Sequence, residues 1–234
     1  MDYLLELFFS GLTRGSIYAL IALGYTMVYG ILELINFAHG EIYMIGAFTG
    51  LIAATLLAPL ALPAPLVLAL AAAAAVLWAA AWGLAVERLA YRPLRAAPRL
   101  APLISAIGVS ILLQNFVLLA QTPDFVSFPN LVPELAGLEP FAACVGSTEV
   151  AILTVTAAAM IALTLFVRGT RTGRAMRAVA QDRTMALLCG VDVDRVVAVT
   201  FAVGSALAAL GGVLIGSHVG QINFSIGFIA GIKA

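Results

Sequence analysis

The sequence predicts an all-α, polytopic membrane helix bundle with about six spans. Of the 234 residues, 63% are hydrophobic and 10% are charged, whereas soluble chains carry about 25% charged residues. Uncharged runs recur along the chain, and several reach the length of about 20 residues that a spanning helix needs. Ten of the twelve basic residues fall in two segments between those runs. Because so few charged residues cannot cover the surface of a soluble domain, we expect a single transmembrane domain over residues 1–234.

The uncharged runs place six spans in order along the chain. Residues 3–12, which include Glu6, are expected to form an interfacial lead-in to the first span. The second and third spans share Ile42–Val86, which prolines at 59, 63 and 65 divide, because proline ends a helix. The other expected spans are Gly15–Leu32, Leu100–Pro123, Val150–Val167 and Val196–Ser217.

The basic residues orient these spans. Segments 87–99 and 168–195 contain four and six arginines, and an even number of spans separates them, so both can face the same side. The positive-inside rule makes that side cytoplasmic. Segment 124–149 contains four acidic residues and no basic one, and it is expected outside, where it could receive a soluble partner. Counting back puts the N-terminus outside, which leaves Arg14 as one basic residue against the rule.

A polar segment, Ile31–Met44, separates the first two spans. Asn36, His39 and Glu41 in this segment are candidates to line a transport path, because ionisable groups near a membrane are costly and often mark pathways. Gly40 and its neighbours disfavour a continuous helix, so we expect a break here. Two alternatives stay open, an ordinary wet turn between spans and a metal site or proton relay on His39 and Glu41. For the metal, the segment lacks further ligands at suitable spacing.

The arginine-rich segment 168–195 is expected to lie in water outside the bilayer, as a loop that binds another protein. Within it, Gly173–Gly190 can form a short amphipathic helix. Small residues at near-helical spacing, one acidic residue and two leucines supply its contacts: Ala178, Asp182, Ala186, Gly190, Leu187 and Leu188. The alternative is a basic helix that lies on anionic lipid, although three aspartates in the segment oppose a purely electrostatic anchor.

Small residues also recur four positions apart, as in helix pairs that pack closely within membranes. These pairs favour tight packing inside this chain, and the alternative is a contact face for a partner subunit. They are Gly11/Gly15, Gly46/Gly50, Gly212/Gly216/Gly220 and Gly227/Gly231.

Several classes of function are excluded by missing motifs. The sequence has no G-x-x-x-x-G-K-[ST] loop, no H-E-x-x-H motif and two histidines in all. We therefore expect no enzyme activity and no catalytic, cofactor or metal site in this chain, so any ATP must be bound by another polypeptide. The arginines border spans rather than forming a basic face, so no nucleic acid is expected. Cys144 and Cys189 are expected on opposite sides of the membrane and unpaired.

Four blocks of sequence carry a resemblance to a known family. They are GSIYALIALGYTMVYGILELINFAHGEIYMIGAF, ERLAYRPLR, LISAIGVSILLQN and GRAMRAVAQDRTMALLCGVDVDRVVAVTFAVGSALAALGGVL. In this order, and over nearly the whole chain, they resemble the permease subunit of branched-chain amino-acid ABC importers, the LivH type. The resemblance implies a bacterial inner-membrane protein that pairs with a second homologous permease, two cytoplasmic ABC ATPases and an extracytoplasmic solute-binding protein.

The resemblance also implies roles for particular residues. Segment 168–195 is similar to the family's cytoplasmic coupling region, so Ala178, Asp182, Ala186 and Gly190 are candidates for contact with the ATPase. Asn36 to Glu41 matches a family hallmark near the pathway. Family members continue past GFIAGIKA with further membrane helices, so the chain is expected to be truncated there. The implied solutes are leucine, isoleucine and valine. Alternatives are a permease for urea or short amides, an ATP-independent transporter or channel, and a non-transporting structural subunit.

Overall fold

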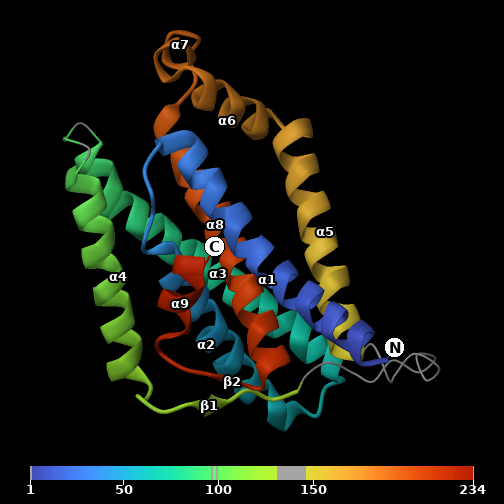
Figure 1. Ribbon diagram of the computed structural model, residues 1–234. Coiled ribbons are helices and arrows are strands. Elements are labelled where there is room, and N and C mark those ends of the chain that lie inside the picture. Colours follow the sequence, from blue (N-terminus) through green and yellow to red (C-terminus); the bar gives the residue numbers. More distant parts are fainter. Residues whose placement is uncertain (1, 96, 99, 131–145, 234) are drawn as a thin grey trace.

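Six long apolar helices form the body of the molecule in the computed structural model (Figure 1), which describes residues 2–95, 97–98, 100–130 and 146–233. This confirms the predicted six spans. Arg99, Cys144 and positions 131–145 of the acidic segment lie outside the described residues. The six helices are α1 (Asp2–Leu32), α2 (His39–Leu57), α3 (Ala64–Val86), α4 (Leu100–Ala120), α5 (Ser147–Gly169) and α8 (Val193–Val219).

Short elements connect or flank these helices. Two of them, β1 and β2, pair antiparallel, with Val126 opposite Ile222, and they lie at the end of the bundle away from α6 and α7 (Figure 1). The short elements are η1 (Ala58–Leu60), the π-helical turn η2 (Glu87–Tyr91), η3 (Arg92–Leu94), β1 (Val126–Ser127), α6 (Arg171–Gln181), α7 (Arg183–Leu188), β2 (Gln221–Ile222) and α9 (Ile226–Lys233).

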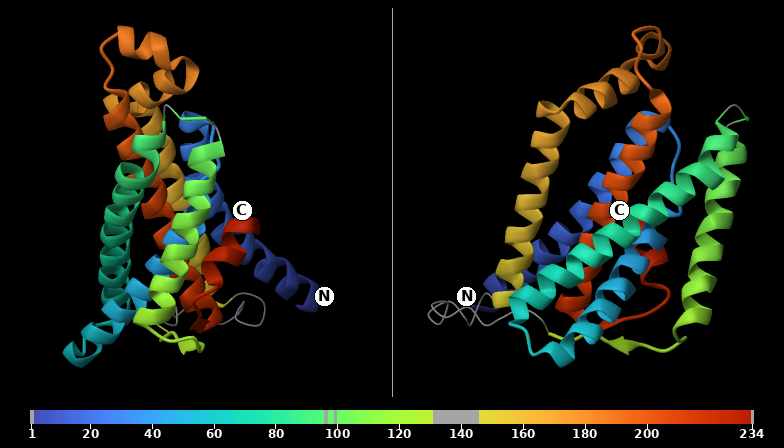
Figure 2. Two further views of the ribbon diagram at one scale, coloured as in Figure 1. Left: turned by 90° about the vertical axis from the view of Figure 1, so that its left-hand side faces the viewer. Right: turned by 180° about the vertical axis from the view of Figure 1, so that it is seen from behind.

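α1 is one continuous helix of 31 residues, so residues 3–12 belong to the same helix as the first span, and their position at the membrane interface stays a prediction. The first half of α1 contains no proline, so nothing in the backbone stops the helix there. At about 1.5 Å per residue such a helix reaches about 46 Å, which exceeds a hydrocarbon core of about 30 Å. The N-terminal part of α1 accordingly stands away from the other helices (Figure 2).

α8 lies at the centre of the bundle and packs against α1, α2 and α3. Glycines permit the close approach, as was expected from their spacing. Gly46 of α2 faces Ala209, and Gly212 of α8 faces the backbone of Tyr43 and Ala47, so a side chain at either position would meet the opposite helix. These pairs therefore pack inside the chain. Gly11 and Gly15 have no atom of the described residues within 4 Å of a Cβ position.

The predicted break between the first two spans is confirmed. Residues 33–38 are non-helical, and Glu33 has a φ of 54°, a left-handed conformation that is uncommon outside glycine. From the end of α1 the chain returns into the bundle before α2 begins at His39, and α9 lies at the same height (Figure 1). The N-terminus of α2 is therefore inside the bundle.

The two arginine-rich segments share one end of the bundle, as predicted. Figure 1 places the end of α3 and helices α6 and α7 at this end. The described parts of the acidic segment, 124–130 and 146–149, lie at the opposite end with η1 and β2. The distribution of charge along the sequence thus corresponds to two chemically different ends of one bundle.

Candidate functional site

Helices α6 and α7 form a helical elbow, residues 171–188, which projects beyond the ends of α5 and α8 (Figure 1). The prediction of a single helix over Gly173–Gly190 is wrong, because two helices occupy this segment. Asp182 has an extended backbone, with φ −153° and ψ 108°, and its side chain accepts a hydrogen bond of 2.9 Å from the Met185 amide. Aspartate is a strong N-cap residue, so Asp182 ends α6 and begins α7.

The elbow is attached firmly to the end of α5. Thr170 caps α6 by accepting a hydrogen bond of 2.9 Å from the Gly173 amide. A Cβ on Gly173 would lie 2.5 Å from the carbonyl oxygen of Phe166, so glycine permits this close approach. Arg177 donates a hydrogen bond to the Val167 carbonyl. Because these contacts involve backbone atoms, α6 and the end of α5 should move together.

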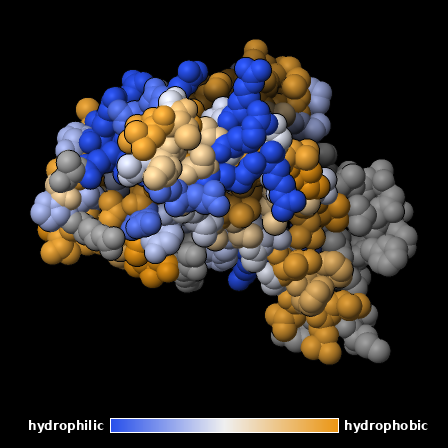
Figure 3. All heavy atoms as spheres, turned by 90° about the horizontal axis from the view of Figure 1, so that it is seen from above, coloured by the Kyte–Doolittle hydropathy of each residue, from blue (hydrophilic) through white to orange (hydrophobic). Residues whose placement is uncertain are grey.

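The tip of the elbow exposes three large apolar side chains, called here the apolar tip. Met185 is 58% exposed, Leu187 56% and Leu188 77%. Seen from above, this end shows an apolar patch bordered by hydrophilic side chains (Figure 3). Apolar side chains gathered on a polar surface mark interaction sites. The sequence analysis predicted contacts for both leucines but not for Met185. The signal that could have found it is that Met185 is itself a large apolar residue close to the leucines in a charged segment.

The structure separates the four coupling candidates. Asp182 and Gly190 are exposed, and Ala178 is half-buried. Ala186 is 4% exposed and belongs to the hydrophobic core together with Val193. Its side chain therefore faces the protein's own interior, because α7 turns that face towards α8. Contact of Ala178, Asp182 and Gly190 with a partner stays a prediction.

The three pathway candidates are buried, which excludes the wet-turn interpretation for them. Asn36 and His39 are 1% exposed, and Glu41 is 0% exposed. Asn36 Oδ1 accepts hydrogen bonds from the Tyr91 hydroxyl at 3.0 Å and the Ala38 amide at 3.1 Å. We call residues 36–41, whose polar side chains are buried, the buried polar turn.

Glu41 and His39 point to different neighbours. Glu41 Oε1 accepts a hydrogen bond of 3.1 Å from Ser110 of α4, and a Cβ on Gly227 of α9 would lie 2.8 Å from Oε2. The His39 ring meets the Tyr25 ring of α1 edge to face, with centroids 5.2 Å apart. The described residues contain no group of three His, Cys, Asp or Glu side chains that could hold a metal ion.

The buried polar turn contains polar atoms without partners. Asn36 Nδ2, His39 Nε2 and Glu41 Oε2 are buried and have no hydrogen-bond partner among the described residues. Each such atom costs about 1–3 kcal/mol of stability, and persistent costs of this kind gather at functional sites. A cavity of about 140 Å³ lies beside Ser110, between α4 and α9. The turn can therefore offer hydrogen-bonding groups to a polar solute if the surrounding helices move.

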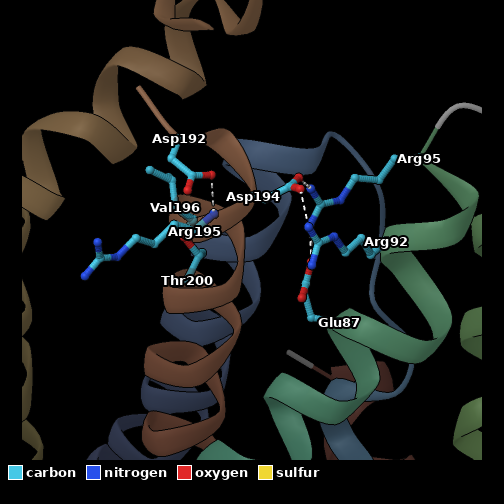
Figure 4. Close-up of polar contacts among 8 residues, drawn as sticks. All are labelled: Glu87, Arg92, Arg95, Asp192, Asp194, Arg195, Val196 and Thr200. Atoms are coloured by element: carbon cyan, nitrogen blue, oxygen red, sulfur yellow. Dashed lines mark hydrogen bonds and ion pairs between the residues drawn. The ribbon is translucent and has the colours of Figure 1, made fainter. Parts of the chain in front are cut away.

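A second polar cluster joins the two arginine-rich segments, and we call it the ion-pair bridge (Figure 4). Arg92 Nη2 lies 2.6 Å from Asp194 Oδ2 in the first turn of α8. Arg95 pairs with both Asp194 and the buried Glu87. Sequence reasoning missed this cluster because Asp194 lies about a hundred positions from its two arginines, and the acidic first turn of α8 was its one local signal.

Comparisons with known proteins agree with this architecture. Residues 7–234 match the family model described as branched-chain amino acid transport system / permease component. The chain is 48% identical, over 99% of its length and 77% of the relative's, to the high-affinity branched-chain amino acid transport system permease protein LivH of Escherichia coli (strain K12). It is 49% identical, over 96% of its length and 75% of the relative's, to BraD of Pseudomonas aeruginosa. No solved structure matches the chain.

Proposed function

This chain belongs to the branched-chain amino acid transport permease family, and from that premise we propose that it carries leucine, isoleucine or valine through the membrane for an ATP-driven importer. It is a multi-pass membrane protein, and its described residues include six long apolar helices. The chain itself is not an enzyme in this proposal and binds no cofactor. Two cytoplasmic ABC ATPases hydrolyse the ATP, a second homologous permease completes the bundle, and a solute-binding protein delivers the amino acid from outside.

The apolar tip is the observation that carries this proposal. Three large apolar side chains stand at the end of the elbow, outside the six spanning helices (Figures 1 and 3). Burying a leucine side chain contributes about 1.5–3 kcal/mol, so a partner with an apolar groove would gain several kcal/mol by covering the tip. The proposed occupant is the ATPase, and the elbow transmits its movement.

The positive-inside rule supports the orientation. Both arginine-rich segments lie at the elbow end of the bundle (Figure 1), so that end is assigned to the cytoplasm of a bacterium and the bundle to its inner membrane. The N-terminus and the acidic segment 124–149 are then outside. In this proposal the ATPases bind at the elbow, and the solute-binding protein binds at the end with β1 and β2.

The test is transport in proteoliposomes that contain the permease pair, the ATPases and the solute-binding protein. Uptake of labelled leucine should require ATP, and excess isoleucine or valine should reduce it, whereas urea and acetamide should not. Uptake of leucine without ATP would establish the alternative, a channel or secondary transporter. Uptake of urea or acetamide alone would support the other branch of the family.

The buried polar turn is the proposed transport path, and Glu41→Gln tests it. An amino acid carries an ammonium group, and hydrogen bonds to a charged partner contribute about 1.5–3 kcal/mol. Replacing the buried carboxylate by the amide should therefore lower leucine uptake at least about tenfold. The matched control is Glu33→Gln, which alters an exposed carboxylate that precedes the turn. Unchanged uptake by a folded Glu41→Gln protein would remove Glu41 from the path.

A further inference from the structure

We propose that the ion-pair bridge and Tyr91 couple the helical elbow to the buried polar turn. Tyr91, Arg92, Arg95 and Asp194 then act as positioning residues for transport, since they touch neither ATP nor solute. The inference rests on the proposed function. It adds the route by which a movement of the elbow would reach the buried polar turn, which is the proposed transport path. Three successive contacts carry the argument.

The first contact joins the elbow to the start of α8. Residues 189–192 are all that separates α7 from α8, and this link is short and bonded back to the elbow. The Gly190 amide donates to the Leu187 carbonyl at 2.9 Å, and the Val191 amide donates to the Ala186 carbonyl at 3.0 Å. Asp192 then caps α8 by accepting a hydrogen bond of 3.0 Å from the Arg195 amide (Figure 4). A displacement of the elbow must therefore move the first turn of α8.

The second contact joins the first turn of α8 to the end of α3. Asp194 binds Arg92 and Arg95, and Arg95 also binds Glu87 (Figure 4). Glu87 is buried and Arg95 is largely buried, so these charges are weakly screened by solvent. The ion pair of Arg95 with Asp194 joins the two helices, and its arginine is 13% exposed and its aspartate 48%, so solvent screens it less than a pair of fully exposed side chains. The end of α3 should therefore follow Asp194 when α8 moves.

The third contact joins the end of α3 to the buried polar turn. Tyr91 directly precedes Arg92, is buried, and ends the π-helical turn η2. Its ring packs on Phe201 of α8, with centroids 5.2 Å apart. Its hydroxyl donates to Asn36 Oδ1, the same atom that accepts the Ala38 amide immediately before α2. Asn36 Oδ1 thus accepts one hydrogen bond from the end of α3 and one from the residue before α2, so it links these two helix ends.

These contacts form one continuous series from the elbow to Asn36, three residues before His39. Coupling between distant sites is carried by such hydrogen bonds, ion pairs and rigid elements when the elements have two arrangements. A single π-helical turn is frequent at functional sites, and η2 lies in the series where the spanning helix α3 ends. Movement of the elbow would accordingly reorient the buried polar turn through Tyr91.

Tyr91→Phe is the sharpest test, because it removes one hydroxyl and keeps the ring on Phe201. The complete complex, with its ATPases and solute-binding protein, is reconstituted, and leucine molecules transported per ATP hydrolysed are measured. We expect this ratio to fall at least about threefold, while the ATPases still copurify in full amount. The matched control is Tyr29→Phe, whose ring is exposed at the end of α1, and its ratio should equal that of the unaltered protein.

Asp194→Asn probes the same series from its other end and does not depend on the folding of the Tyr91 variant. Asp194 is half-exposed, so its replacement should leave the bundle folded and lower the same ratio. The double variant, Tyr91→Phe with Asp194→Asn, should transport no less leucine per ATP than the more impaired single variant, as expected for two positions in one series. Ratios that stay unchanged in Asp194→Asn, or effects that simply multiply in the double variant, overturn the inference.

Failure of the inference and failure of the proposed function give different results. If the unaltered complex shows no ATP-dependent uptake, the proposed function is wrong. If the unaltered complex couples ATP to uptake and both single variants do so equally well, the coupling route alone is wrong. If Tyr91→Phe lowers the amount of bound ATPase as well as the ratio, Tyr91 acts on assembly and the route is also wrong.

Discussion

Leu188→Asp should abolish stable binding of the ATPase subunits to this permease. Leu188 is the most exposed of the three side chains of the apolar tip, at 77%, so its replacement leaves the bundle folded. A buried leucine contributes about 1.5–3 kcal/mol, and a carboxylate in the same groove would lose its hydration without gaining a partner. We expect an affinity loss of at least about 100-fold, which corresponds to about 2.7 kcal/mol.

The measurement is copurification of the ATPases with the detergent-solubilised permease, followed by leucine uptake in proteoliposomes. The matched control is Thr184→Asp, which places the same charge at an exposed position of α7 outside the apolar tip. The control should retain the ATPases. Full recovery of the ATPases with Leu188→Asp would mean that the tip is not the contact, and the lipid-bound interpretation of the elbow would then gain support.

Ala186→Trp is less informative than Leu188→Asp for the same question. Ala186 is buried against the protein's own core, so a tryptophan there would displace α7 from α8 and change the elbow itself. Overfilled cores typically lose about 1–3 kcal/mol. A loss of ATPase binding by that variant would therefore report the folding of the elbow and not a contact with the partner.

Gly212→Leu should have the largest effect on stability. A Cβ at this position of α8 would meet the carbonyl of Tyr43 and lie 2.9 Å from the amide nitrogen of Ala47. Both are backbone atoms of α2, which cannot rotate away as a side chain can, so the two central helices must separate. A cost of about 2–3 kcal/mol should lower the melting temperature by about 5–10 °C in a chain of this size.

The measurement is thermal unfolding of the purified protein in detergent, followed by a reporter that does not depend on transport. Gly108→Leu is the matched control, because it adds the same side chain to the spanning helix α4 at a position where no atom of the described residues lies within 4 Å of a Cβ. It should shift the melting temperature by about 1 °C or less. Equal shifts in both variants would show that α2 and α8 tolerate separation.

The spans and the shared end of the arginine-rich segments could be predicted because they follow from local composition. The run Ile42–Val86 was divided correctly at its prolines, since the breaking of a helix by proline is a property of the backbone. The break before His39 was predicted for a similar reason. The continuity of α1 was not, because residues 3–12 were expected to lead into the first span, whereas they are part of the same helix.

The site was predicted less completely than the spans. Asn36, His39 and Glu41 were named, but their burial could not be predicted, because a polar turn between spans is wet in some bundles and buried in others. The elbow was expected as one helix, and the capping by Asp182 divided it into two. The burial of Ala186 depended on that division, because the start of α7 after Asp182 sets which face of α7 turns towards α8.

Composition and periodicity by themselves determined that this chain is a six-span membrane bundle with one arginine-rich end, because helix formation and transfer into lipid depend on neighbours within about twenty residues. Only the tertiary structure decided that Tyr91 meets Asn36, that Arg92 and Arg95 meet Asp194, and that Leu188 stands outside while Ala186 is buried. Those pairings join residues 55 to 102 positions apart, and they depend on how α3 and its end pack against α8, which local sequence does not fix.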